Sequence, residues 1–216
     1  MEITYLGHSS FKIKGKSTTV ITDPYDSDMV NMKFPKTEGD LVTISHHHDD
    51  HDAVENISNV KKVIDGPGEY EVSGVSIIGL QTFHDDKKGE ERGKNTIYVI
   101  EIDKFRLLHL GDLGHKLDDN QIKEIGTIDI LFIPVGGFYT IDAKVAVEVQ
   151  KQIGASIVIP MHFKTDGLNP ELSKNLSSVD AFIQESGLRV EKLPKLNIKE
   201  GDINSEDEYA VILEKK

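Results

Sequence analysis

The feature that most constrains this chain is an internal run of histidine and aspartate, His46-His47-His48-Asp49-Asp50-His51, directly after the apolar residues 41–45. Four of the nine histidines lie in these six positions. An expression tag would be terminal and uninterrupted, so the run belongs to the protein. Imidazole and carboxylate groups are good ligands for Zn, Mn, Fe and Co. The run therefore favours a fold that gathers metal ligands at the end of a β-strand.

The spacing inside the run suits more than one metal ion. Residues two apart in an extended strand point to the same side, so His46 and His48 can bind one cation together. If the chain then turns into the start of a helix, Asp50 and His51 face a neighbouring point. One short loop can thus supply ligands to two adjacent sites. A solvated polar loop is the alternative interpretation, and the apolar strand before the run weakens it.

Three more residues of metal-ligating type follow other predicted strands. His84 comes after residues 75–80, Asp112 after 105–110 and His162 after 156–159. Catalytic residues often gather where strands give way to loops. Taken singly, each would be an ordinary loop residue. Together with the run, they supply enough ligands for two metal sites.

Short β-rich segments alternate with a few amphipathic ones. We expect strands at residues 3–6, 11–14, 18–22, 41–45, 62–64, 69–72, 75–80, 96–102, 105–110, 128–133, 156–159, 188–191 and 209–213, and helices at 52–57, 119–125, 142–153 and 177–185. Residues 23–39 and 85–94 are expected to be loops, the second charged and exposed. No low-complexity linker divides the chain. This pattern predicts a single domain, residues 1–216, in which two sheets pack face to face with helices outside.

Composition excludes several classes of function. The 216 residues include no cysteine, which rules out disulfides, thiolate metal sites and cysteine nucleophiles. The formal net charge of −12 argues against nucleic-acid binding, because phosphate neutralisation needs clustered Lys and Arg. No apolar run approaches the roughly 20 residues that span a bilayer, and no secretory leader is visible. We therefore expect a cytoplasmic protein with a small-molecule substrate and no membrane or nucleic-acid partner, and homo-oligomerisation is left open.

The histidine-rich run, together with His84, Asp112 and His162, resembles the motifs of the metallo-β-lactamase superfamily. These motifs are H-x-H-x-D-H after a strand, then a lone His, a Gly-Asp and a final His. Further segments are similar to its compact subgroup, which includes ascorbate-6-phosphate lactonase-like proteins and metal-dependent hydrolases: residues 5–10, 22–24, 109–112, 134–137 and 160–163. The resemblance covers the chain from about residue 3 to about residue 164. It implies an α+β fold, a four-layer αββα sandwich of two mixed sheets with outer helices.

The resemblance also implies a set of metal ligands. A first ion would be bound by His46, His48 and His84. A second ion would be bound by Asp50, His51 and His162, and Asp112 would bridge the two. The cofactors would be two divalent metal ions per chain, with zinc favoured and manganese or iron as alternatives.

The implied activity is metal-dependent hydrolysis. Two cations ~3.5–4 Å apart can share a water and lower its pKa toward ~7. The resulting hydroxide would attack an ester, lactone or phosphoester of a small molecule, with Asp50 and Asp112 holding it in line as catalytic residues. His48 stands where diiron redox relatives carry Glu, which favours hydrolysis. A nuclease of the same fold, a mononuclear iron redox enzyme and a non-catalytic metal-binding protein are the alternatives.

Seven other residues are weaker candidates for the site. His8, Asp23 and His109 lie in the subgroup motifs and are candidates for orienting the ligand imidazoles. Candidates for substrate binding flank the ligand-bearing loops: Phe138, Tyr139, Lys164 and Thr165. For all seven, the alternative is an ordinary loop or core residue.

Overall fold

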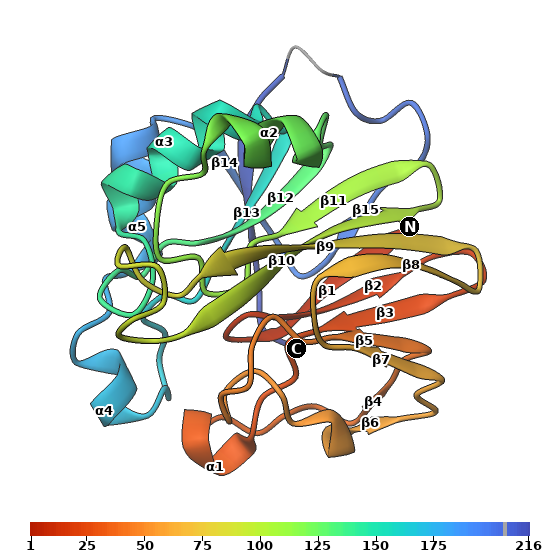
Figure 1. Cartoon of the computed structure of the whole chain (residues 1–216), viewed down its shortest axis with the longest axis horizontal. Helices are drawn as coiled ribbons and strands as arrows, with labels where there is room; N and C mark the ends of the chain where they lie inside the picture. Colours follow the sequence, from red (N-terminus) through yellow and green to blue (C-terminus); the bar gives the residue numbers. More distant parts are fainter. Residues whose placement is uncertain (205–206) are drawn as a thin grey trace.

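The computed structural model describes residues 1–204 and 207–216, and two stacked mixed sheets dominate it (Figure 1). The smaller sheet has the order β15-β1-β2-β3-β5-β7, with β1 (Glu2–Gly7), β2 (Ser10–Lys14), β3 (Thr19–Thr22), β5 (Leu41–Thr43), β7 (Lys62–Ile64) and β15 (Leu196–Asn197). Its strands are antiparallel from β15 to β3 and parallel from β3 to β7. A separate parallel pair is formed by β4 (Thr37–Glu38) and β6 (Ile57–Ser58).

The larger sheet has eight strands in the order β14-β16-β13-β12-β11-β10-β9-β8. Their bounds are β8 (Gly68–Val72), β9 (Val75–Phe83), β10 (Lys94–Ile102), β11 (Phe105–His109), β12 (Ile130–Pro134), β13 (Ile157–Met161), β14 (Arg189–Leu193) and β16 (Tyr209–Leu213). Pairing is parallel from β14 to β11 and antiparallel from β11 to β8. Strands β9, β11 and β13 therefore run in the same direction and end at the same edge of the sheet.

Alternating side chains give the larger sheet two buried faces. On β10, Tyr98 and Ile100 point to the core between the sheets, whereas Ile97 and Val99 point to the core under the helices. Across the inter-sheet core, Phe11 of β2 and Phe132 of β12 pack with ring centroids 4.5 Å apart. The two sheets are thus held at a fixed distance by closely packed apolar side chains.

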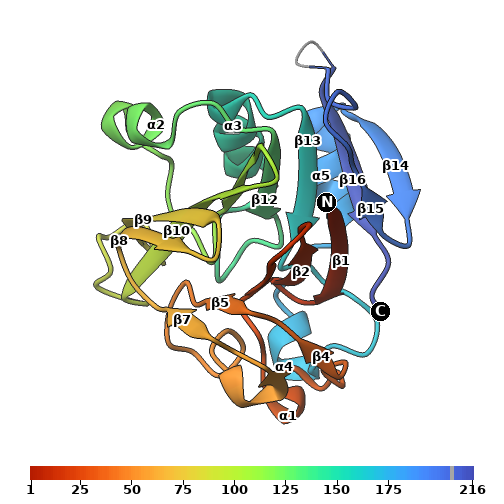
Figure 2. The ribbon, with the colours of Figure 1, turned by 90° about the vertical axis from the view of Figure 1, so that its right-hand side faces the viewer.

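Helices cover the outside of both sheets (Figure 2). The larger sheet is covered by α2 (Asp119–Ile125), α3 (Ala143–Ile153) and α5 (Val179–Ser186). The smaller sheet has a thinner cover, made of α1 (Ser27–Val30), a 3-10 turn (Val54–Asn56) and α4 (Pro170–Ser173). The expected αββα order of layers is confirmed. No helix in the described ranges has both the length and the apolar character needed to cross a bilayer.

Some predicted elements need correction. The helix expected over 52–57 is only the 3-10 turn, because the Asp52 carboxylate pairs with His47 at 3.2 Å and does not cap a helix. The helix expected from residue 142 begins at Ala143, since Asp142 is its N-cap. The segment 23–39, expected as a loop, contains α1, which the Asp26 side chain caps. The prediction of a single domain stays a prediction.

The inter-sheet core predicts a large stability effect for Phe132. Replacing this fully buried ring by alanine should lower the free energy of unfolding by about 3–5 kcal/mol, because the cavity cannot close between two sheets. The matched control is Phe138→Ala, since that ring is 56% exposed and should cost less than about 0.5 kcal/mol. Urea unfolding of both variants measures the difference, and equal losses would contradict this description of the core.

Candidate metal centre

All the predicted ligands lie at one edge of the sandwich, where strands of both sheets end. His46, Asp50 and His51 follow β5 of the smaller sheet. His84 follows β9 directly, and His162 follows β13 directly. Asp112 lies three residues after the end of β11. Because β9, β11 and β13 are parallel to one another, their final residues converge on the loop that carries the histidine-rich run.

The candidate ligand atoms fall into three groups, in each of which they lie within 4.8 Å of one another. One group consists of His46, His48 and His84. A second consists of His8, Asp50, His51 and His162, and a third of His46, His51 and Asp112. The first two match the two ligand sets implied by the sequence resemblance, with His8 added to the second. The third group connects them.

Asp112 lies between the two sets. Its Oδ2 is 3.2 Å from Nε2 of His84 and 3.2 Å from Nε2 of His162. Its Oδ1 is 3.4 Å from Nε2 of His51. The backbone N–H of Asp112 donates to Oδ1 of Asn95, which fixes the loop. This is the place that a carboxylate bridging two ions would occupy.

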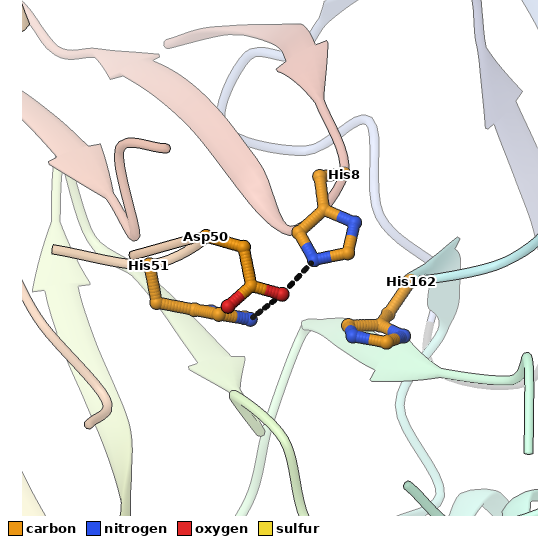
Figure 3. A group of neighbouring side chains, drawn as sticks. All are labelled: His8, Asp50, His51 and His162. Atoms are coloured by element: carbon orange, nitrogen blue, oxygen red, sulfur yellow. Dashed lines mark hydrogen bonds and ion pairs between the residues drawn. The ribbon is translucent and has the colours of Figure 1, made fainter. Parts of the chain in front are cut away.

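The second set includes one imidazole that the sequence placed outside it. Nε2 of His8 lies 3.1 Å from Oδ2 of Asp50, and Nε2 of His51 lies 3.7 Å from the same oxygen (Figure 3). The rings of His8 and His162 have centroids 4.3 Å apart. His8 therefore faces Asp50 directly, so it orients this carboxylate and is also close enough to be a ligand itself.

The carboxylate of Asp23 fixes two ligand imidazoles at once. Its Oδ2 accepts from Nδ1 of His51 at 2.9 Å and from Oγ of Ser45 at 2.6 Å. The Ser45 hydroxyl lies 2.9 Å from Nδ1 of His46. Because that hydroxyl donates to Asp23, it accepts from His46. In their neutral forms both imidazoles thus carry the proton on Nδ1, and their Nε2 lone pairs point into the site.

Unusual backbone conformations concentrate at this edge. His8, Asp23 and His162 have positive φ angles of 54°, 38° and 50°. A left-handed conformation costs a residue with a side chain roughly 1–2 kcal/mol. Gly111 has a φ of 52°, and a Cβ there would lie 2.4 Å from Cβ of Ser45. The ligand loops are therefore held in shapes that only the surrounding structure stabilises.

The charges of the site are strongly interdependent. Burial disfavours a charged imidazole, yet the carboxylates of Asp112 and Asp50 raise the pKa of His51 well above its ordinary value. Burial likewise opposes ionisation of Asp112, yet His162 and His51 hold its pKa well below the usual range. Burial, reinforced by His51, lowers the pKa of His46 to about 2. Burial opposes ionisation of Asp50 as well, yet His51 and the hydrogen bond from His8 hold its pKa far below the usual range. Both carboxylates thus stay ionised and require a positive charge between them, from a proton or from a metal ion.

The unsatisfied atoms of the site fit a metal ion better than a proton. Nε2 of His46, Nε2 of His51 and Oδ1 of Asp112 are buried without a hydrogen-bond partner in the described residues. A buried polar atom without a partner is costly and needs an explanation. These three residues form one of the groups of possible ligands. Lone pairs that converge in this way suit a divalent cation.

The other candidates differ in their relation to the site. His109 is fully buried, and its Nε2 donates to the carbonyl of Ser9 at 2.9 Å, so it fixes the loop that follows His8. Phe138 and Tyr139 line cavities at the site. Lys164 is exposed, and Oγ1 of Thr165 faces Sδ of Met32. The last two are absent from the lining of both cavities, so the geometry gives no support for their role in substrate binding.

A cavity of about 390 Å³ opens onto the candidate ligands. Its lining includes His48, Asp50, His84, Asp112 and His162, together with Met29, Arg92, Tyr139 and Leu172. A second cavity of about 420 Å³ shares His84, Arg92 and Tyr139 with the first. Small-molecule sites commonly have volumes of roughly 300–1,000 Å³. Sequence reasoning missed Arg92, because it lies in a charged loop expected to be exposed.

Comparison with known proteins supports the family expected from the sequence motifs. A family model described as the beta-lactamase superfamily domain matches residues 2–162. The chain belongs to the metallo-β-lactamase superfamily. A UPF0173 metal-dependent hydrolase of Thermoplasma volcanium is 31% identical over 206 residues, covering 82% of this chain and 92% of that protein. A UPF0173 metal-dependent hydrolase of Thermococcus onnurineus is 29% identical over 192 residues, covering 76% and 85%.

A solved structure of a protein from Thermotoga maritima has the same fold as this chain over the whole length of the chain. That protein is described as a candidate zinc-dependent hydrolase of the metallo-β-lactamase superfamily. It is 38% identical, with a TM-score of 0.80, and the match covers 100% of this chain and 99% of that chain. The family resemblance and the fold class expected from the sequence are both confirmed.

The Asp23 network predicts a loss of metal affinity on a conservative change. Asp23→Asn keeps the size but offers an amide to Nδ1 of His51, so the affinity for Zn²⁺ should fall by roughly 10- to 100-fold. Calorimetric titration of metal-stripped protein measures it. Asp40→Asn is the control, because that carboxylate pairs with Lys61 at 2.8 Å, outside the site. Unchanged affinity in Asp23→Asn would show that the network does not orient the ligands.

Burial of His109 predicts a pH effect on stability. Burial lowers the pKa of His109, so below about pH 6.5 the unfolded chain takes up a proton that the folded chain excludes. Stability should therefore fall as the pH falls. In His109→Gln, the slope of unfolding free energy against pH between 6.5 and 5 should be smaller by up to about 1.4 kcal/mol per pH unit. Identical slopes in urea unfolding of the two proteins would refute this.

Proposed function

We propose that this chain is a metal-dependent hydrolase that binds two divalent cations, zinc in preference to manganese or iron, and cleaves an ester, lactone or phosphoester of a small molecule. The supporting observation is that three residues distant in the sequence, His84, Asp112 and His162, converge on the four candidate ligands of the histidine-rich run, and that Asp112 joins the two ligand sets. Imidazole-rich sets with carboxylates suit zinc well. The family and its metal-dependent hydrolases make this the best-supported function.

In this proposal each set holds one ion. His46, His48 and His84 would hold the first and Asp50, His51 and His162 the second, and Asp112 lies between the two sets and would be shared by them. When bound, such a pair of cations lowers the pKa of a shared water, so that a hydroxide nucleophile is available near neutral pH. No nucleophilic side chain is needed.

The chain's own residues orient the reactants and handle protons. Asp23 and Ser45 keep the His46 and His51 lone pairs directed at the site. Asp50 is held by the imidazole of His8 and is placed to accept a proton from the attacking water. The cavity of about 390 Å³ admits a small molecule and brings its scissile bond next to Asp50 and Asp112.

Metal analysis combined with a hydrolase screen tests the proposal. The purified protein should contain close to two equivalents of divalent metal and should hydrolyse at least one ester, lactone or phosphoester in the panel. His48→Ala should lose metal and more than about 100-fold of the turnover, because even partners that only orient a ligand cost 10- to 100-fold. Asp112→Asn should lose both as well.

The neighbouring imidazole provides the matched control. His47 is exposed, its Nδ1 faces Asp52, and it belongs to none of the three groups of candidate ligands, so His47→Ala should keep its metal even though the residue lines the cavity. A single iron without hydrolytic turnover would favour a redox enzyme. Metal-dependent melting without turnover of any substrate would favour a binding protein, and cleavage of RNA that depends on His48 would favour a nuclease. Full turnover in His48→Ala would show that the ligand assignment is wrong.

A further inference from the structure

Arg92 occupies a singular place at the mouth of the site. Among the described residues that line the 390 Å³ cavity, it is the one Lys or Arg side chain. It also lines the neighbouring 420 Å³ cavity, together with His84 and Tyr139. Its guanidinium therefore lies where a molecule bound at the candidate ligands would extend into the second cavity.

The loop that carries Arg92 is built around a buried carboxylate. Asp85 is only 3% exposed, and its two oxygens accept hydrogen bonds at 2.8–3.0 Å from the backbone N–H groups of Lys87, Gly89, Glu91 and Arg92. On the other side, Gly114 is so close that a Cβ there would lie 2.2 Å from the Asp85 nitrogen. The backbone of Arg92 is thus fixed relative to the ligand His84, although residues around it are exposed.

The head of Arg92 has no strong partner in the protein. Within the described ranges no group accepts a hydrogen bond from the guanidinium, and its one ion pair, with Glu91, is 3.8 Å long. The guanidinium lies over the ring of Phe138, 5.9 Å from its centroid. Cation–π contact of this kind holds an arginine in place while leaving its N–H donors free.

Phe138 itself is unusual, which strengthens the argument. Its ring is 56% exposed, and its backbone has a φ of 58°. A bulky residue in the left-handed region is strained, and such strain concentrates at ligand-binding sites. If the Phe138 ring served only to pack in the hydrophobic core, neither its exposure nor its backbone strain would be explained. A platform that carries the Arg92 side chain beside the cavity accounts for both.

We propose that Arg92, supported by Phe138, determines specificity by binding an anionic group of the substrate, a carboxylate or a phosphate monoester, at a point remote from the bond that is cleaved. This inference rests on the proposed hydrolase function and names the class of its substrates. The guanidinium offers a planar pair of N–H donors that matches both anions. The chain has a formal net charge of −12, so an anionic substrate would need a local positive charge at the cavity, and the weakly paired guanidinium of Arg92 supplies one.

Matched substrates test this inference. The substrates are 4-nitrophenyl esters whose acyl tails end in a carboxylate (succinate, glutarate and adipate), the methyl esters of the same tails, and analogues that end in a phosphonate. For the anionic member of a pair, Arg92→Gln should raise KM by roughly 10- to 100-fold with little change in kcat. For the neutral member, kcat/KM should stay within about twofold. Arg92→Lys should retain part of the preference, and the carboxylate and phosphonate arms show which anion is bound better.

Lys87→Gln is the matched control, because Lys87 is an exposed cation of the same loop that pairs with Glu91 and lies outside both cavity linings. It should change neither member of a pair. Equal losses on neutral and anionic esters in Arg92→Gln would reveal a structural role and overturn the inference, as would no loss on either.

A binding measurement separates this inference from the proposed function. Calorimetry of the metal-loaded protein with glutarate and with 4-phosphonobutyrate should give at least tenfold weaker binding in Arg92→Gln for one of the two. If the wild-type protein hydrolyses no ester but Arg92→Gln binds one of the two anions at least tenfold more weakly than the wild type, the hydrolase proposal fails and the anion site stands. If it hydrolyses neutral and anionic esters equally well and binding is unaffected, the anion site fails and the hydrolase proposal stands.

Discussion

The structure depends on one electrostatic constraint: two buried carboxylates, Asp50 and Asp112, share an edge of the sandwich with imidazoles as their only ion-pair partners in the described chain. An ionised carboxylate without compensation inside a protein costs several kcal/mol. Since no Lys or Arg pairs with either group there, the compensation must come from protons on the imidazoles or from bound cations. The His46 and His51 lone pairs, left free by the Asp23 network, make the second answer the chemically complete one.

This constraint explains why the rest of the edge is so firmly built. The carbonyl of His8 accepts from the His162 N–H at 3.1 Å, and the carbonyl of Ser45 accepts from the Thr96 N–H at 2.8 Å, so backbone bonds join the two sheets at the site. Behind them lies the inter-sheet core, with Phe132 fully buried. A ligand set that had to be ordered by its metal would lose affinity to conformational entropy, whereas loops fixed by the fold do not.

The sequence predicted which residues gather at this edge, because each candidate ligand has a residue type and a position after a strand that the pattern shows. A histidine or aspartate shortly after an apolar strand lies at an edge of a sheet, and in this fold the relevant strands all end at the same edge of the sandwich. Interactions within loops leave no such signal. Asp85 was expected in an exposed loop, yet it organises that loop from inside and places Arg92. Proximity in sequence also misled, since Lys164 follows His162 closely but the chain turns away and Lys164 bonds to Ser177 through its backbone.

Helices were less predictable where capping decided the outcome. Asp119–Ile125 was predicted with its observed bounds, because Asp118 and Gln121 form a capping box around an amphipathic turn. Over residues 52–57 the same kind of signal failed, since the carboxylate of Asp52 is drawn to His47 instead. An imidazole five residues earlier competes with the backbone N–H groups for this one carboxylate, and the outcome depends on the shape of the loop, which the residue pattern does not show.

The proposed anion site is compatible with the acidic composition of the chain once distance is considered. At physiological ionic strength the screening length is about 8 Å, so exposed carboxylates on other faces of the molecule contribute little at the cavity. What a ligand meets there is decided by the groups within that distance. Asp50 and Asp112 are directed at the candidate metal positions, and Asp85 accepts hydrogen bonds from four backbone N–H groups. Asp49 lines the first cavity, and Asp86, Asp142 and Lys116 line the second. With two divalent cations in place, the proposed site would offer an excess of positive charge, and Arg92 would extend it toward the second cavity.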